Sequence, residues 1–420
     1  MAEKTTLPNG VRILVERVPA VRTVSVGIWV KAGSRYERAE INGVSHFIEH
    51  MLFKGTDSRT AGDLAVEMDE IGGQVNAFTT KDMTCFYIRT LDTCLKAAID
   101  ILCDMFFNSK FAEEDVAMER SVIMEEIDMY EDSPEDLSVE SLISGVFGSS
   151  PLGWPVLGSK ETVSALTSDD MRAYMSELYR APSVVIALAG SIDEDCIEYI
   201  KSAFSKMPAD PAGTFEPAGY SRSFTAKKKT IEQTHIALGF PSLPSGSEDI
   251  YALNMVNSIL GGGMSSRLFQ SVREKNGLCY AVYSFNAAHA DAGLFSVYTA
   301  CSDQTAEAAF GLICEEIYRF ADKGATDDEI ARCRRQIETG ILMGLESTGS
   351  RMNFIARNEL VYGRDISYDE IIKRYEAVSS EDILAVSRKI LDLSSYSLSV
   401  VSKSAELDKM KIAVERLSAN

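Results

Sequence analysis

The chain has 420 residues, 45% of them hydrophobic and 25% charged, which is a globular composition with enough apolar material for a large core. Its formal net charge of −20 argues against nucleic acid as the main partner. The acidic excess has two readings, which are a soluble surface or a negative interior that favours basic peptides.

Residues 1–17 predict strands around a turn at Asn9-Gly10, and they lack the basic head and apolar centre of a signal peptide. The sequence contains no run of about 18 or more apolar residues, so we expect no membrane partner. These features predict a cytoplasmic protein. The eight cysteines form no Cys-x-x-Cys pair, which predicts free and mostly buried thiols.

Strand and helix signals mix along the chain. Thr23–Lys31 and Phe86–Thr90 alternate as strands do, whereas Leu95–Phe107 and Thr305–Ala321 have helical periodicity. Strand signals that no helix separates favour antiparallel pairing. We predict an α+β fold in which largely antiparallel sheets have helices packed on one face.

The strongest local signal for chemistry is the sequence HFIEH at residues 46–50. We predict a helix that starts near Asn42, a good N-cap residue. Its apolar stripe consists of Val44, Phe47, Ile48, Met51 and Leu52. At about 100° per residue, His46 and His50 point away from this stripe, and Glu49 lies beside them.

Two imidazoles one helical turn apart can bind one zinc ion, and a nearby carboxylate can take a proton from a coordinated water. The alternative is a solvated helix face with incidental histidines. Two of the four histidines in the chain lie in this pentapeptide, which favours the metal site.

The acidic stretch 112–132 is the best source of the third ligand that a catalytic zinc usually needs. Its predicted helix has an apolar arc that includes Val116, Met118, Val122, Ile123, Ile127, Met129 and Tyr130. Glu119 and Glu126 fall near the centre of this arc, and Glu125 falls at its margin. A carboxylate on a buried face needs a cation or hydrogen bonds to compensate its charge. From the residues alone, Glu126 and Glu125 both stay open as the ligand.

A segment rich in proline, glycine and alanine, 208–220, divides the chain nearly in half. We place one domain at 1–210, a linker at 211–220 and a second domain at 221–420. The halves match at a constant offset of 212 residues in three places, which are 24–28 with 236–240, 165–171 with 377–383, and 183–188 with 395–400. Each half is therefore expected to be one copy of the same α+β unit.

The second copy is expected to lack a metal site. At the offset of 212 residues, the sequence HFIEH corresponds to SILGG at 258–262, which offers no ligand. The two copies would face each other across a groove, which is a plausible place for a site.

These segments resemble the pitrilysin family of zinc peptidases, which includes insulin-degrading enzyme and the mitochondrial processing peptidase and has an inverted His-x-x-Glu-His motif. His46–Thr56, Gly72–Thr80 and Glu119–Ile127 are similar to the family's zinc, substrate-strand and third-ligand segments. Arg273–Tyr280 resembles its arginine–tyrosine pair. The resemblance spans essentially the whole chain, and the nearest size class is the single-chain bacterial peptidases that resemble the processing peptidase's catalytic subunit.

The resemblance implies one zinc per chain, with Glu126 as the third ligand, Glu119 in the shell that supports the ligands and Glu49 as the general base. It implies that Arg273 and Tyr280 stabilise the developing oxyanion or hold the adjacent substrate backbone.

The resemblance also implies a substrate strand. Asn76, Ala77 and Phe78 are expected on an edge strand, to which an extended peptide would add by backbone pairing. The implied activity is that of a zinc-dependent endopeptidase, which hydrolyses peptides or unfolded segments in a chamber between facing domains. Family members build this chamber from four units, whereas one chain supplies two. A homodimer is therefore implied, in which Arg273 and Tyr280 act on the zinc of the other chain.

Two other classes stay open, a non-catalytic scaffold or peptide-binding subunit and a protein in which zinc only stabilises the fold. Respiratory-complex core proteins resemble the family but have degraded zinc motifs, whereas His46, Glu49, His50 and Glu126 are all present here. The noncatalytic processing subunit has a long glycine-rich loop, and only Gly261–Gly263 corresponds to it in this chain.

Overall fold

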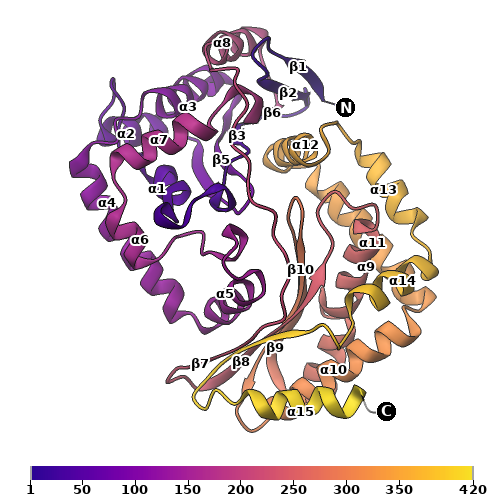
Figure 1. Cartoon of the computed structure of the whole chain (residues 1–420). Coiled ribbons are helices and arrows are strands. Elements are labelled where there is room, and N and C mark those ends of the chain that lie inside the picture. The colour runs from indigo at the N-terminus through magenta and orange to yellow at the C-terminus, as the bar shows by residue number, and fades with distance from the viewer. Residues whose placement is uncertain (1, 419–420) are drawn as a thin grey trace. The chain divides into compact units, whose positions relative to one another are not determined.

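The computed structural model describes residues 2–418, and these divide into two compact units with one sheet each (Figure 1). Unit 1 comprises the described residues up to Ile127, together with Trp154–Glu216 and Ile341–Ser367. Unit 2 comprises Asp128–Gly153, Pro217–Gly340 and the described residues from Tyr368 onward. Each unit therefore combines most of one sequence half with a shorter piece of the other.

Unit 1 is built on a six-stranded sheet with the strand order β1-β2-β6-β3-β5-β4. The β2–β6 pair is parallel and the other neighbouring pairs are antiparallel. The strands are β1 (Glu3–Thr6), β2 (Arg12–Arg17), β3 (Thr23–Val30), β4 (Gln74–Thr79), β5 (Thr84–Leu91) and β6 (Val184–Gly190). β1 and β2 form the predicted hairpin, and β4 lies at an edge of the sheet.

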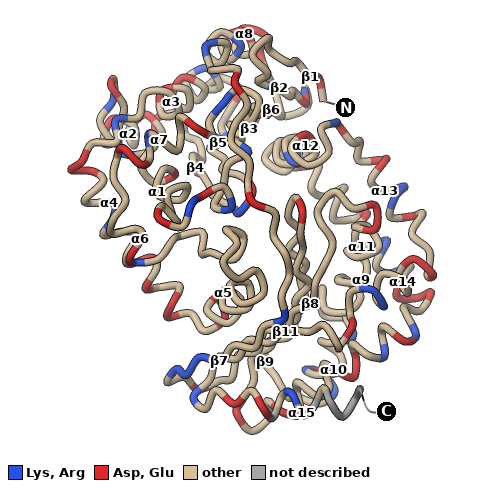
Figure 2. The backbone as a smooth tube through the Cα atoms, in the orientation of Figure 1, with Lys and Arg blue, Asp and Glu red and all other residues tan. Residues whose placement is uncertain are grey.

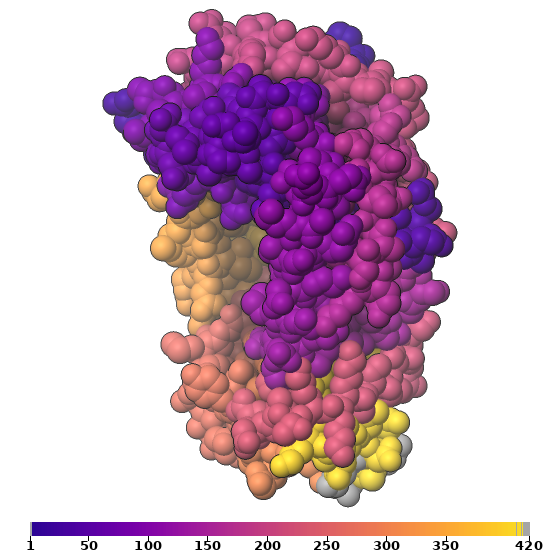
Figure 3. Space-filling model, turned by 90° about the vertical axis from the view of Figure 1, so that its left-hand side faces the viewer, coloured from indigo at the N-terminus to yellow at the C-terminus, as the bar shows by residue number. Residues whose placement is uncertain are grey.

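Both faces of this sheet are covered, because successive side chains of a strand point to opposite faces. Val26 and Ile28 of β3 belong to the main core of the unit, whereas Trp29 packs with Met352 and Ile355 of α12 on the other face. In Figure 3 the early part of the chain, coloured indigo to purple, lies at the surface of unit 1. The helices assigned wholly or mainly to unit 1 are α1 (Val44–Met51), α2 (Ala61–Glu70), α3 (Leu95–Asn108), α4 (Glu113–Asp132), α6 (Lys160–Ala165), α7 (Ser168–Leu178), α8 (Glu194–Phe204) and α12 (Thr348–Tyr362).

Unit 2 is built on a five-stranded sheet with the strand order β7-β11-β8-β10-β9, in which the β7–β11 pair is parallel. The strands are β7 (Phe224–Lys228), β8 (Gln233–Ser242), β9 (Cys279–Ala288), β10 (Gly293–Ser302) and β11 (Ser397–Ser402). The helices assigned wholly or mainly to unit 2 are α5 (Pro134–Phe147), α9 (Ile250–Gly261), α10 (Ala306–Lys323), α11 (Asp327–Gly344), α13 (Tyr368–Ala377), α14 (Ser380–Ile390) and α15 (Leu407–Ser418). Leu238 and Phe240 of β8 face the main core, and Ala237 packs with Leu142 of α5 on the other face.

The duplication is visible in the elements. Adding 212 to the bounds of α7 gives the bounds of α14, and the same offset relates α5 to α12 within a few residues. Yet α5 belongs to unit 2 and α12 to unit 1, so the equivalent helix of each half packs on the sheet of the other half. The predicted domain boundaries at 210 and 221 stay a prediction, because each compact unit contains segments from both sequence halves.

The predicted α+β fold is confirmed, and most predicted elements differ from the observed ones by one or two residues at an end. All eight cysteines are free, and six are buried. In the part of the chain that the structure describes, no helix has both the length and the apolar character needed to cross a bilayer. Acidic residues occur along helices of both units, α4 and α14 among them (Figure 2).

Candidate metal centre

Helix α1 carries both histidines of the motif. It begins at Val44 with Gly43 as the N-cap residue, so the predicted start near Asn42 is corrected by about two residues. Gly43 has φ +97°, and a Cβ there would lie 2.6 Å from the carbonyl oxygen of Leu157. The chain therefore needs glycine at this turn. The predicted apolar stripe is fully buried, which turns the other face of α1 toward α4.

Helix α4 carries the candidate carboxylates, and its buried stripe is narrower than predicted. Val116, Glu119, Ile123 and Ile127 are buried, at the spacing of one helix face. Glu126 is half-buried and Glu125 is exposed. The other apolar members of the predicted arc are exposed, which are Met118, Val122, Met129 and Tyr130. A helical wheel drawn from sequence overestimated this arc because it counted every apolar residue as buried.

The structure brings His46, His50 and Glu126 together. The two Nε2 atoms lie 3.3 Å apart, and Oε2 of Glu126 lies 3.7 Å from Nε2 of His46 and 3.6 Å from Nε2 of His50. One potential ligand atom from each residue lies within 4.8 Å of the others. Glu126 rather than Glu125 therefore points to the histidines.

These side chains fit a zinc ion. Tetrahedral zinc with bonds of about 2.0–2.1 Å separates its ligand atoms by about 3.3 Å, which agrees with the spacing of these three atoms. Burial, with a smaller contribution from neighbouring His50, lowers the pKa of His46 to about 3. The imidazole of His46 is therefore neutral at physiological pH, as a metal ligand must be. Two imidazoles and a carboxylate that converge in this way are well suited to hold a divalent cation.

Glu119 contacts the Nδ1 side of the His50 imidazole, and Lys54 contacts Glu119. Oε1 of Glu119 lies 2.8 Å from Nδ1 of His50, and Nζ of Lys54 lies 2.5 Å from the other oxygen, Oε2. A proton on Nδ1, held by the Glu119 carboxylate, leaves the lone pair of Nε2 free for a metal. Lys54 compensates the charge of the buried Glu119.

Glu49 lies next to the ligands but is held by a different contact. The hydroxyl of Thr79, on edge strand β4, donates to Oε2 of Glu49 at 2.5 Å. Burial raises the pKa of Glu49, and the Thr79 hydrogen bond and the nearby His50 offset part of this rise. A carboxylate with a raised pKa is a better proton acceptor than an ordinary one.

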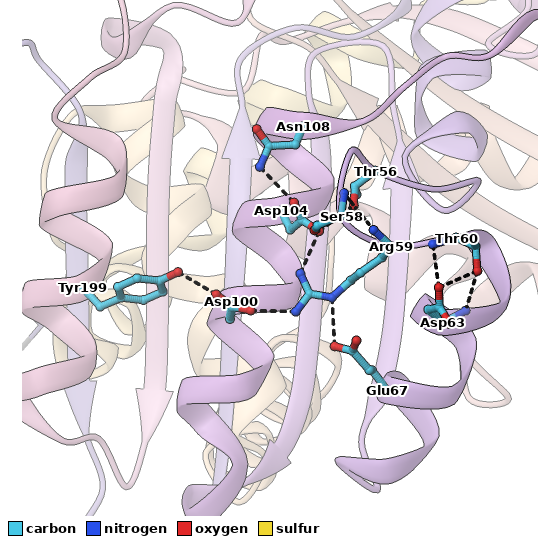
Figure 4. Close-up of polar contacts among 10 residues, drawn as sticks. All are labelled: Thr56, Ser58, Arg59, Thr60, Asp63, Glu67, Asp100, Asp104, Asn108 and Tyr199. Carbon is cyan, nitrogen blue, oxygen red and sulfur yellow. Dashed lines mark hydrogen bonds and ion pairs between the residues drawn. The ribbon is translucent and has the colours of Figure 1, made fainter.

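A polar network around Arg59 fixes the loop that follows α1 (Figure 4). The guanidinium donates to Glu67, Asp100 and Asp104 at 2.9, 2.7 and 2.7 Å. The hydroxyl of Thr56 donates to the same Asp104 oxygen at 2.6 Å, which ties the loop to α3. The network therefore anchors the segment between α1 and α2, in which Lys54 lies.

The other side of this network lines a cavity of about 750 Å³ between α3, α7 and α8. Its lining includes Arg59, Asp100 and Asp104, whereas none of the three candidate ligands borders it. This cavity is thus separate from the candidate metal centre.

The remaining predicted site residues divide between the units. Asn76, Ala77 and Phe78 lie on β4, which pairs only with β5 among the described strands. Arg273 and Tyr280 belong to unit 2, where the guanidinium carbon lies 5.1 Å from the tyrosine ring centre. The side chain of Tyr280 is 76% exposed.

Lys54 and Thr79 were not predicted as site residues. Lys54 follows His50 by four residues but lies beyond the end of α1, so helical spacing does not predict its contact with Glu119. Thr79 follows the predicted edge strand directly, but its contact with Glu49 depends on how α1 packs beside β4, which no local pattern reveals.

Comparison with known proteins supports the resemblance. Residues 12–160 match the family model described as Insulinase (Peptidase family M16), and residues 165–337 match the one described as Peptidase M16 inactive domain. All three candidate ligands fall in the first match, and the half without the motif supplies most of the second.

Relatives that align with this chain over most of their own length support the same family. A Bacillus subtilis protein named an uncharacterized zinc protease is 40% identical, over 97% of this chain and 100% of that protein. A Streptomyces coelicolor protein with the same description is 43% identical, over 92% of this chain and 87% of its own length. A solved structure described as a peptidase M16 inactive domain from Pseudomonas fluorescens covers 96% of this chain and 98% of its own, with a TM-score of 0.89 at 20% identity, which bears on the fold alone. The chain therefore belongs to peptidase family M16, the insulinase or pitrilysin family.

Proposed function

We propose that this protein is a zinc-dependent endopeptidase whose zinc is held by His46, His50 and Glu126, one ion per chain. The observation that carries the proposal is the convergence of these three ligand atoms on one point, beside the carboxylate of Glu49. The names of its relatives, which are zinc proteases, support the same reading.

Zinc, when bound, supplies a Lewis acid that lowers the pKa of a coordinated water to about 7. Glu49 accepts the proton of the attacking water and later passes it to the leaving amine. Thr79 holds one oxygen of Glu49 and leaves the other available for the proton. Glu119 and Lys54 keep the imidazole of His50 in the tautomer and orientation that binding requires.

Edge strand β4 would bind the substrate next to α1. A peptide in extended conformation can pair with the free edge of β4 through its backbone, so affinity would depend weakly on side chains. The contacts between α1 and β4 support this placement, because they set Glu49 beside the strand.

Arg273 and Tyr280 would stabilise the oxyanion or hold the substrate backbone from unit 2. The exposed phenol of Tyr280 beside the guanidinium of Arg273 supports a role in binding. The duplication supports a chamber of four units, and hence a homodimer in which these two residues act on the zinc of the other chain.

Substitution of the general base tests the proposal. Glu49→Gln keeps the shape of the side chain and removes its basicity, so we expect zinc content to be unchanged and turnover of a quenched-peptide panel to fall about 10²–10⁴-fold. Glu125→Gln, an exposed glutamate of α4, should keep both properties. A chelator should abolish the parent's activity. Undiminished turnover by Glu49→Gln would remove Glu49 from this role.

A further inference from the structure

Glu37 is a buried carboxylate that neither the motif nor the mechanism uses. Glu37 is 3% exposed and precedes the first residue of α1 by seven positions. Among the described residues, no lysine, arginine or histidine forms an ion pair with it. A buried charge without a cation costs stability, so its hydrogen bonds deserve an explanation.

The carboxylate of Glu37 accepts hydrogen bonds from residues at the start of α1. Oε2 accepts from Nδ2 of Asn42 and from the backbone N–H of Gly43, both at 2.8 Å. Oε1 accepts from the backbone N–H of Ser45 at 2.9 Å. Both oxygens are thus committed to the first turn of the helix that carries the zinc ligands.

This arrangement replaces an ordinary cap. Helices α2, α7 and α14 begin with a threonine or serine whose side chain caps its own helix. Helix α1 has Gly43 at this position, where the left-handed backbone and the close approach of Leu157 exclude a side chain. The acceptor must therefore come from elsewhere in the chain, and Glu37 supplies it.

The position of His46 makes the cap matter for the metal. Helix α1 has eight residues, and His46 is the third of them, in the turn whose N–H groups Glu37 accepts. Loss of these hydrogen bonds would let the first turn fray and move His46 relative to His50, which lies in the last turn. Ligand geometry must hold within about 0.5 Å for full affinity.

We infer that Glu37 is a positioning residue of the metal centre, which fixes the first turn of α1 and thereby the imidazole of His46. The inference rests on the proposed metal centre. It adds to that centre a residue that contacts neither the candidate ligands nor Glu49. Glutamine at this position keeps one acceptor oxygen and turns an NH₂ group toward a backbone donor, so it cannot reproduce the cap.

The test measures metal binding instead of turnover. In Glu37→Gln, we expect the zinc dissociation constant, measured by competition with a chromogenic chelator, to rise about tenfold. The visible spectrum of the cobalt-substituted protein should also change, because it reports ligand geometry. Asn42→Ala, which removes one donor to Glu37 and keeps the carboxylate, should shift both readouts in the same direction by less. This milder variant also serves if Glu37→Gln does not fold.

Glu359→Gln is the matched control. Glu359 is equally buried, 3% exposed, and lies in the same unit, but it pairs with Lys4 of β1. This variant should lower stability and keep the parent's zinc constant and cobalt spectrum.

If the parent protein binds zinc, two results would overturn this inference and leave the proposed function intact. One is parental zinc affinity and spectrum in both Glu37→Gln and Asn42→Ala, and the other is an equal shift in Glu359→Gln. A parent that binds no zinc would overturn the proposed function itself.

Discussion

Single carboxylates near α1 differ in role because their surroundings differ. Glu126 points to two imidazoles, Glu119 lies between His50 and a lysine, and Glu49 accepts a hydroxyl hydrogen bond from the edge strand. Glu125, adjacent to Glu126, is exposed. The proposed roles of the same chemical group, as ligand, support or base, thus follow from which face of its helix it occupies.

Removal of Lys54 tests the support of His50. In Lys54→Met, Glu119 keeps its burial but loses its cation, so its hold on His50 weakens. We expect the zinc dissociation constant to rise about tenfold, as for other changes behind a metal ligand. Lys96→Met, an exposed lysine of α3, should leave it unchanged. Equal zinc affinity in Lys54→Met and the parent would show that Lys54 has no part in binding.

Glu37 predicts a specific dependence of stability on pH. Burial raises the pKa of Glu37 to about 6, and its hydrogen bonds from Gly43 and Ser45 offset only part of this rise. A folded-state pKa above the unfolded value of about 4.5 means that the folded protein binds more protons in this window. Its contribution to stability is therefore fully present below pH 4.5 and is lost as pH rises through 6.

In metal-stripped protein, this group alone should reduce the free energy of unfolding by about 1.5 kcal/mol between pH 4.5 and 6.5. Urea unfolding of the parent and of Glu37→Gln at both values measures the difference, and the variant should lack this decrease. The same pH dependence in both proteins would contradict the raised pKa.

At the scale of elements, the sequence predicted α1 best, because its apolar stripe and its two histidines both follow the repeat of an α-helix. For α4 it left Glu126 and Glu125 open, since a wheel assigns directions but cannot say which apolar residues are covered. Met118 and Val122 show the difference, because both are apolar and exposed. The exchange of α5 and α12 was beyond prediction, because an amphipathic helix does not encode which sheet it covers.

The loop between α1 and α2 depends on Arg59. The side chain is 17% exposed and donates to three carboxylates, so Arg59→Ala would leave three negative charges close together. We expect the free energy of unfolding to fall by about 1–3 kcal/mol, measured as a lower urea midpoint. Arg22→Ala, which removes one exposed ion pair with Asp92, should have a much smaller effect. Equal midpoints for the two variants would contradict the anchoring role of the network.

For the whole molecule, the duplication places the candidate site residues in different halves of the sequence. One half carries the candidate zinc ligands, and the other carries Arg273 and Tyr280. The dimer proposal predicts complementation between inactive chains. In a mixture of His50→Ala and Arg273→Ala chains, half of the dimers are mixed, and one of their two sites has every residue intact. Peptide hydrolysis should recover to about a quarter of the parental rate in a two-fold symmetric dimer. Mixed dimers with no activity above either variant would contradict action in trans.

Zinc titration of the metal-stripped protein tests the central claim most directly, with bound zinc and peptide hydrolysis measured on the same samples. The claim predicts that hydrolysis rises in proportion to bound zinc and stops rising at one ion per chain. Peptide hydrolysis at the full rate before any zinc is added would contradict it.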